Sequence, residues 1–137
     1  MNIAVILAGG VGSRMRSDGF PKQDVDVGGK PVLVYTLEKF ENCPSVDKII
    51  VVANEQWQED IAAWAKKFHI RKLCAIAEPG ETRQESVLSG LLACENFTES
   101  DKDMVLIHDA ARPLVTCELI EACIEAGQSS DGCLPVI

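Results

Sequence analysis

Separate segments of the sequence carry residue types that suit the binding of a phosphorylated ligand. The first runs Leu7-Ala8-Gly9-Gly10-Val11-Gly12-Ser13-Arg14-Met15 and begins at the end of an apolar run. Glycine backbone can turn tightly and approach a ligand closely, and successive N–H groups in such a turn form a concave site for anions. The guanidinium of Arg14 adds a planar fork that matches phosphate oxygens. This segment predicts a phosphate-binding turn, and the alternative is a tight turn with a surface arginine.

The glycine spacing excludes two common nucleotide motifs. Counting from Gly10 and Gly12, Met15 stands where the dinucleotide fingerprint G-x-G-x-x-G needs its third glycine, and the P-loop pattern G-x-x-x-x-G-K-[ST] is absent. The second segment, Pro21-Lys22-Gln23, follows a loop-like stretch. Lys22 would fold back over the glycine turn and neutralise charge on a transferring α-phosphate. Taken alone, such a lysine is usually just a solvated surface residue.

The third segment, Val105-Leu106-Ile107-His108-Asp109-Ala110-Ala111-Arg112-Pro113, ends a predicted buried strand with an acidic residue. A carboxylate at the carboxyl edge of a sheet is well placed for Mg²⁺, which takes one or two carboxylates together with phosphate and water oxygens. Asp109 is therefore the candidate metal ligand. Arg112 is the candidate for pairing with a second anionic substrate. We expect His108 to be structural rather than catalytic.

A fourth segment, Pro79-Gly80-Glu81-Thr82-Arg83-Gln84-Glu85-Ser86, follows a predicted strand and begins a helix. Gly80 permits close approach of a ligand, and Ser86 with backbone groups would recognise the edge of a base. Arg83 either anchors this loop or faces the ligand. The same residues also fit a helix N-terminus in which Thr82 is the cap and Glu85 its capping-box partner. The two interpretations are compatible.

Strands and helices alternate along the chain in a way that would position these segments. Continuous apolar runs predict buried parallel strands at residues 2–8, 48–53, 72–77, 103–108 and 132–137. Apolar residues at helical spacing predict helices at 31–40, beginning with Pro31, and at 56–68, 82–93 and 117–126. The alternation predicts an α/β fold of the Rossmann-like, doubly wound type, a mostly parallel sheet with helices on both faces. Such sheets bind ligands at the carboxyl ends of their strands.

Size and charge exclude several classes of function. The 137 residues predict one nucleotide-binding α/β domain over residues 1–137. A formal net charge of -8 argues against nucleic acid as a partner. Residues 1–30 hold four basic and three acidic side chains, so the acidic excess lies elsewhere, and a locally basic start suits a small anionic ligand. No apolar run approaches the roughly 20 residues that a membrane span needs.

The cysteines indicate packing rather than disulfides or a metal site. They form no C-x-x-C pair and no zinc-finger cluster, and no signal peptide is recognisable. Free cysteines of this kind predict a reducing, cytoplasmic location. The six are Cys43, Cys74, Cys94, Cys117, Cys123 and Cys133. The last residues, Leu134-Pro135-Val136-Ile137, are typical of a strand entering the sheet, so we expect this chain to be the N-terminal part of a longer catalytic domain.

In combination the segments resemble a known family. They occur in the order found in the cytidylyltransferases that make 4-diphosphocytidyl-2-C-methylerythritol in isoprenoid synthesis, of which the ribitol-5-phosphate cytidylyltransferases are close relatives. The resemblance covers nearly the whole chain. The glycine turn alone is shared with many nucleotidyltransferases, whereas the stretch from His108 to Pro113 is specific. The motifs are the glycine turn with Arg14, then Pro21-Lys22-Gln23, Thr82-Arg83-Gln84-Glu85-Ser86-Val87 and His108-Asp109-Ala110-Ala111-Arg112-Pro113.

The resemblance implies a role for each candidate residue. Arg14 and Lys22 would be catalytic, stabilising the triphosphate and the pentavalent transition state. Asp109 would bind Mg²⁺ near the ribose, and Arg112 would face the polyol phosphate. The nucleotide would be bound by Ala8, Gly9, Gly10, Gly12, Gly80, Arg83, Ser86, Asp109 and Ala110.

The implied reaction is in-line attack of the acceptor phosphate on the α-phosphorus of CTP, with release of pyrophosphate. The acceptor is already ionised at neutral pH, so positioning and charge neutralisation would carry catalysis without a general base. Methylerythritol phosphate is slightly favoured as acceptor over ribitol phosphate, because the motifs around Arg83 and Asp109 lean toward the methylerythritol enzymes. The segment Leu7-Ala8-Gly9-Gly10 and the loop from Arg14 to Lys22 lean the other way.

The resemblance also implies that the full-length protein forms a homodimer and that the family's second half supplies further substrate and metal ligands. Two other interpretations stay open. One is a non-catalytic module that binds and senses CTP. The other is a nucleotidyltransferase that uses GTP or UTP, which the pocket around Gly80 and Ser86 would decide.

Overall fold

The computed structural model describes residues 1–8, 26–27, 30–98 and 103–128. Within these ranges a four-stranded parallel sheet forms the centre of the molecule, with the strand order β5-β4-β1-β6. The strands are β1 (Asn2–Leu7), β4 (Lys48–Val52), β5 (Leu73–Ala77) and β6 (Met104–Asp109). A short antiparallel pair, β2 (Asp26–Val27) and β3 (Lys30–Pro31), precedes the first helix.

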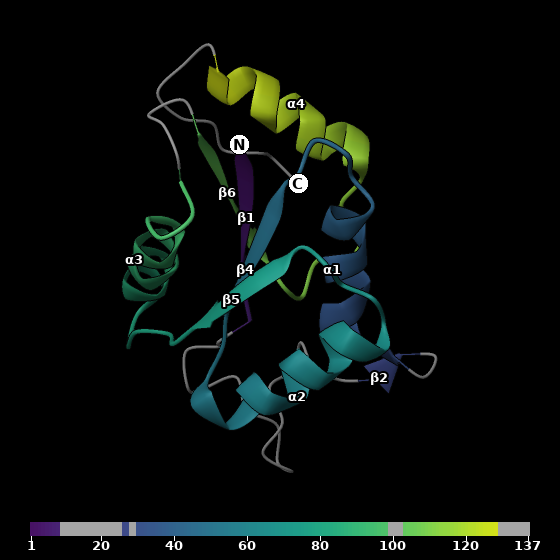
Figure 1. Cartoon of the computed structure of the whole chain (residues 1–137), viewed down its shortest axis with the longest axis vertical. Helices are drawn as coiled ribbons and strands as arrows, with labels where there is room; N and C mark the ends of the chain where they lie inside the picture. The colour runs from purple at the N-terminus through teal and green to yellow at the C-terminus, as the bar shows by residue number, and fades with distance from the viewer. Residues whose placement is uncertain (9–25, 28–29, 99–102, 129–137) are drawn as a thin grey trace.

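Helices cover both faces of this sheet. Figure 1 shows α3 on one side of the strands and α1, α2 and α4 on the other. This arrangement confirms the predicted doubly wound α/β fold. The helices are α1 (Val32–Glu41), α2 (Glu55–Lys67), α3 (Arg83–Cys94) and α4 (Cys117–Gln128).

The central strand β1 explains why the fold has two core layers. Successive side chains of a strand point to opposite faces, so a strand covered on both sides must be apolar throughout. Ala4 and Ile6 belong to the layer shared with α1, α2 and α4, whereas Ile3 and Val5 belong to the layer under α3. All four side chains are fully buried.

The observed element boundaries differ slightly from the predicted ones. Pro31 is not the first helical residue; its extended backbone, with φ -61° and ψ 147°, ends β3 and precedes α1 at Val32. The strand β6 includes Asp109, one residue beyond its predicted end. The β2–β3 pair was not predicted, because strands of two residues carry no periodicity. The strand predicted at 132–137 lies outside the described residues.

The carboxyl ends of β1 and β6 form the point where the strand order reverses. From β1 the chain continues to β4 on one side, and β6 later adds on the other side. The register pairs Leu7 at the end of β1 with Asp109 at the end of β6. Ligands of open α/β sheets bind at such a switch point, so the edge next to Asp109 is where a site is expected.

Gly90 brings α3 close to the sheet. A Cβ at this position would lie 2.5 Å from Cγ1 of Val5 and 3.1 Å from Cγ2 of Val52, two stiff side chains of the core. Gly127 of α4 differs, because a Cβ there would meet the terminal methyl of Met104, which is the far end of a flexible side chain. Close packing of α3 on the sheet therefore depends on a glycine at position 90.

Among the described residues, no helix is both long enough and apolar enough to cross a membrane.

Candidate functional site

Asp109, the last residue of β6, lies between two arginines. Its Oδ1 accepts a hydrogen bond from Nη1 of Arg83 at 2.5 Å, and its Oδ2 lies 3.4 Å from Nε of Arg112. Arg83 begins α3 and Arg112 lies in the loop after β6, so the helix and the strand meet at this carboxylate. Two guanidinium groups against one carboxylate leave an excess of positive charge, which suits an anionic ligand. The sequence predicted each residue but not that they form one cluster.

The ion pairs of this cluster are open to solvent. The side chains of Asp109, Arg83 and Arg112 are 31%, 59% and 54% exposed. Exposed pairs of this kind contribute only about 0–1 kcal/mol each, because water and salt screen them. A ligand with its own charges can therefore compete for each partner, and the cluster is poised to exchange contacts rather than to hold the fold together.

The Gly80 loop rests on the first turn of α3. The backbone N–H of Gly80 donates to Oγ of Ser86 at 3.0 Å, and Ser86 is only 3% exposed. A Cβ at Gly80 would collide with the Cβ of Glu85, so the fold itself demands glycine here. Recognition of a base edge by Ser86 stays a prediction, and its hydroxyl has a structural role that the sequence did not indicate.

The N-terminus of α3 forms half of the predicted capping box. Oγ1 of Thr82 accepts a hydrogen bond from the N–H of Glu85 at 3.1 Å, as expected. The Glu85 carboxylate, however, accepts from the N–H of Glu81 at 2.8 Å rather than from Thr82. One turn on, the hydroxyl of Ser89 donates to the carbonyl of Glu78 at 2.5 Å. Both ends of the loop after β5 are thus tied to α3.

Ala8 and Ala110 line the switch point with their backbones already engaged. The N–H of Ala8 donates to the carbonyl of Val52 at 2.8 Å, and the N–H of Ala110 donates to the carbonyl of Leu7 at 3.0 Å. The carbonyl of Ala110 accepts from Oγ1 of Thr36, a fully buried residue of α1, at 2.6 Å. Their predicted contacts with a nucleotide stay predictions. Thr36 could not be identified from the sequence, because a threonine inside a helical pattern is ordinarily a surface or packing residue.

Within the part of the chain that the structure describes, His108 makes structural contacts, as predicted. Its ring is 6% exposed and lies against Phe40, with ring centroids 5.3 Å apart. Its Nε2 is 3.0 Å from the carbonyl of Arg112. A carbonyl can only accept, so Nε2 carries the proton in this contact. The histidine thereby fixes the backbone that presents Arg112 beside Asp109.

An open hollow of about 960 Å³ lies at the start of α2, after the end of β4. Its charged lining residues among those described are Glu55 and Glu59, and the others are amides: Asn54, Gln56 and Gln58. Carboxylates repel a triphosphate, so the arginine pair around Asp109 is the better candidate for binding an anion. We therefore place the candidate site at Gly80, Arg83, Asp109 and Arg112.

Comparison with known families decides what this geometry belongs to. The sequence model of the family described as IspD, 2-C-methyl-D-erythritol 4-phosphate cytidylyltransferase, matches residues 2–137. The chain belongs to this family. The matched residues include the motifs quoted above, and the predicted family resemblance is confirmed.

Relatives of the IspD family chain carry two substrate names. This chain is 43% identical over 140 residues to a ribitol-5-phosphate cytidylyltransferase of Vibrio parahaemolyticus. The match covers 99% of this chain and 58% of that protein. The chain is 41% identical over 121 residues to a 2-C-methyl-D-erythritol 4-phosphate cytidylyltransferase of Clostridium novyi, covering 88% and 50%. The chain thus spans about half the length of the curated relatives it matches.

A solved structure agrees with the fold. The 4-diphosphocytidyl-2C-methyl-D-erythritol synthase of Anaerococcus prevotii superposes with a TM-score of 0.74 at 26% identity, over 95% of this chain and 52% of that one. A second synthase of the same description gives the same TM-score at 30% identity, over 96% and 56%. The IspD family chain therefore has the α/β nucleotidyltransferase fold.

The other predicted site residues of this IspD family chain lie outside the described residues. These are the two catalytic candidates and three glycines of the first turn: Arg14, Lys22, Gly9, Gly10 and Gly12. Their roles stay predictions.

The side chain of Asp109 fits the donor preference of Mg²⁺. It is a solvent-accessible carboxylate, and Mg²⁺ binds proteins through one or two carboxylates together with phosphate and water oxygens. Both of its oxygens already have a guanidinium partner. A cation at Asp109 would therefore take the place of an arginine, and that arginine would be free to pair with phosphate.

Proposed function

We propose that this chain carries the nucleotide site of a cytidylyltransferase that transfers CMP from CTP to a polyol phosphate. An oxygen of the acceptor phosphate attacks the α-phosphorus, the bond between the α-phosphorus and the bridging oxygen breaks, and pyrophosphate leaves. The observation that carries the proposal is the Arg83–Asp109–Arg112 cluster at the switch point of the sheet. The family membership of the chain supports the choice of cytidylyl transfer as the reaction.

Charge neutralisation is the contribution of the described residues. Asp109 would hold Mg²⁺, which when bound supplies positive charge at the phosphate oxygens. Arg83 would pair with the nucleotide and Arg112 with the acceptor phosphate. The Gly80 loop, fixed by Ser86, offers its backbone to the base. Rigid placement of these groups before the reaction is what would lower the barrier.

For the acceptor we propose 2-C-methyl-D-erythritol 4-phosphate, with ribitol 5-phosphate as the second candidate. The description of the family model supports the first, and the relative that is 43% identical supports the second. Both acceptors are polyol phosphates, so the same Arg112 would serve either. A homodimer and a cytoplasmic location stay predictions.

The deciding experiment measures pyrophosphate release by the full product of the gene with CTP and Mg²⁺. Both acceptors are offered in parallel, and UTP and GTP replace CTP in matched reactions. Turnover with CTP and one acceptor supports the proposal and names the substrate. Tight CTP binding without turnover on either acceptor would instead favour the non-catalytic module.

A further inference from the structure

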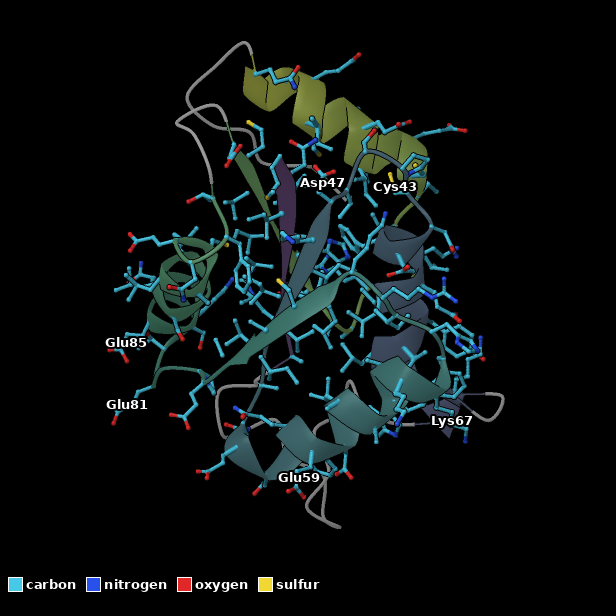
Figure 2. All side chains as sticks on the ribbon, viewed as in Figure 1. Cys43, Asp47, Glu59, Lys67, Glu81 and Glu85 are labelled. Carbon is cyan, nitrogen blue, oxygen red and sulfur yellow. The ribbon has the colours of Figure 1, made fainter. Side chains whose placement is uncertain are left out.

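A second cluster of ligand-bearing side chains lies away from Asp109. Cys43 belongs to the loop between α1 and β4, Cys117 begins α4, and Glu121 follows one turn later. Each offers one ligand atom, and the three atoms lie within 4.8 Å of one another. Figure 2 shows Cys43 beside α4 at the end of the sheet where β4 starts, whereas Glu81 lies near the end of β5. The proposed reaction uses none of these residues.

The sulfur of Cys43 is held in place by its backbone. The carbonyl of Cys43 accepts hydrogen bonds from the N–H of Val46 at 3.0 Å and from Nζ of Lys72 at 2.8 Å. Its Sγ lies 3.9 Å from the carbonyl of Cys117, and the residue is fully buried. The loop therefore presents a thiol to the start of α4 in a fixed position.

The carboxylate of Glu121 is also oriented. Residues four apart share one face of a helix, so Glu121 and Cys117 point the same way. Oγ of Ser45 donates to Oε2 of Glu121 at 2.6 Å. A carboxylate has two oxygens, so the second can serve as a ligand while the hydroxyl holds the first. Such supporting hydrogen bonds are a regular feature of metal sites.

We propose that Cys43, Cys117 and Glu121 bind a thiophilic divalent cation of the zinc class. Zinc takes four tetrahedral ligands, with Zn–S near 2.3 Å, so two thiolates in such a site lie roughly 3.8 Å apart. The 4.8 Å limit on the present separations leaves only small side-chain adjustments to reach that geometry. Three protein ligands leave the fourth position to water. Each thiol that binds releases its proton to solvent.

The choice of cation follows from the donor set. Thiolates favour zinc and related soft ions over Mg²⁺, which prefers oxygen ligands. Two thiolates and one carboxylate carry three negative charges, which a divalent cation offsets in part. The ammonium of Lys72, bound to the carbonyl of Cys43, supplies a further positive charge nearby. The site would join the α1–β4 loop to α4. It does not depend on the proposed transferase activity.

Cobalt titration of the reduced, metal-free full product of the gene tests this proposal. Co²⁺ in a tetrahedral site with thiolates gives a thiolate-to-cobalt charge-transfer band in the near ultraviolet and strong visible bands. We expect both, and we expect zinc but not excess Mg²⁺ to remove them. Asp109 has no thiolate to offer, so a cation bound there cannot produce the charge-transfer band. Its absence would overturn the proposal.

Variants assign the ligands. Cys117→Ser is expected to lose about half of the charge-transfer intensity, and Glu121→Gln to bind zinc at least about tenfold more weakly. Cys74→Ser, at a half-buried thiol under α3, is the matched control and should bind as the parent does. Glu121 is exposed, so its variant tests the site even if Cys43→Ser fails to fold. Unchanged zinc affinity in both ligand variants would refute the site.

Discussion

In the proposed function, Asp109 would meet opposing demands by exchanging partners. In the structure it pairs with Arg83 and Arg112, while the proposed reaction needs it for a cation. Because these side chains are accessible to water, the pairs are weak and a bound triphosphate can take over both guanidinium groups. Under the proposed function, one carboxylate would hold two arginines near the site before the ligand arrives and release them when it binds.

Asp109→Asn should lower the turnover of the full gene product by at least about a hundredfold, the usual effect of removing one charge-stabilising group. Its melting temperature should change little, since the lost ion pairs are exposed. Pyrophosphate release and thermal unfolding measure the two effects. Asp60→Asn on the exposed surface of α2 is the control and should leave both unchanged. An active Asp109→Asn enzyme would contradict the role proposed for this carboxylate.

Among the elements, α3 carries most of the described site. Its first residue is Arg83, its first turn is capped by Thr82, and its Ser86 supports the Gly80 loop. The placement of this helix against the sheet, which Gly90 permits, therefore also places the loop and the arginine.

Ser86→Ala should weaken CTP binding severalfold, because the Gly80 N–H loses its buried acceptor and the loop loosens. The free energy of unfolding should fall by about 1 kcal/mol, as for the loss of one buried hydrogen bond. Thr82→Ala is matched for stability, since loss of an N-cap also costs about 1 kcal/mol, yet it leaves the Gly80–Ser86 bond in place. Calorimetric titration with CTP compares the two. Equal losses of affinity would show that helix stability, not the loop, matters.

Gly90→Ala should destabilise the protein by about 1 kcal/mol or more, although alanine is the better helix former. The new methyl would meet the rigid side chains of Val5 and Val52. Gly127→Ala is the paired experiment, because its methyl meets the movable end of Met104 and the helix gains up to about 1 kcal/mol. Urea unfolding of both variants measures the difference. Destabilisation of the same size in both would mean that the rigidity of the contacted side chain is not decisive.

At the level of the whole molecule, the two core layers differ. Three helices pack on one face and α3 on the other, and Leu88, Leu91 and Leu92 of α3 are 55%, 38% and 53% exposed. The thiol of Cys94 lies in the α3 layer, and burial there raises its pKa from 9.0 to about 11. Its reactivity therefore reports whether this layer stays closed.

A raised pKa means less thiolate at a given pH, so Cys94 should be alkylated slowly in the native protein. At pH 8 the thiolate fraction is about a hundredfold lower than for a thiol with a pKa of 9.0. Labelling with iodoacetamide followed by peptide mass mapping, with and without denaturant, measures the ratio. Rapid native labelling of Cys94 would show that the layer opens readily.

The sequence was sufficient for the fold because each buried strand is a continuous apolar run and each helix has a clear stripe. It also identified Arg83, Asp109 and Arg112 as candidates, since a carboxylate at the carboxyl end of a buried strand suits a cation and arginines suit anionic ligands. It could not join Arg83 to Asp109, because these residues are 26 positions apart and their contact joins α3 to β6. Thr36 and the Cys43–Cys117 pair were missed for the same reason, as their partners are 74 residues away.

The close contact of Gly90 with Val5 also limits the order in which substitutions can accumulate. Gly90→Ala on its own creates a collision, whereas Val5→Ala first removes the Cγ1 that the new methyl would meet. A lineage can therefore reach alanine at both positions by one route more readily than by the other. Among relatives, alanine at the position of Gly90 should be accompanied by a residue smaller than valine at the position of Val5, and an alignment that shows no such pairing would argue against this constraint.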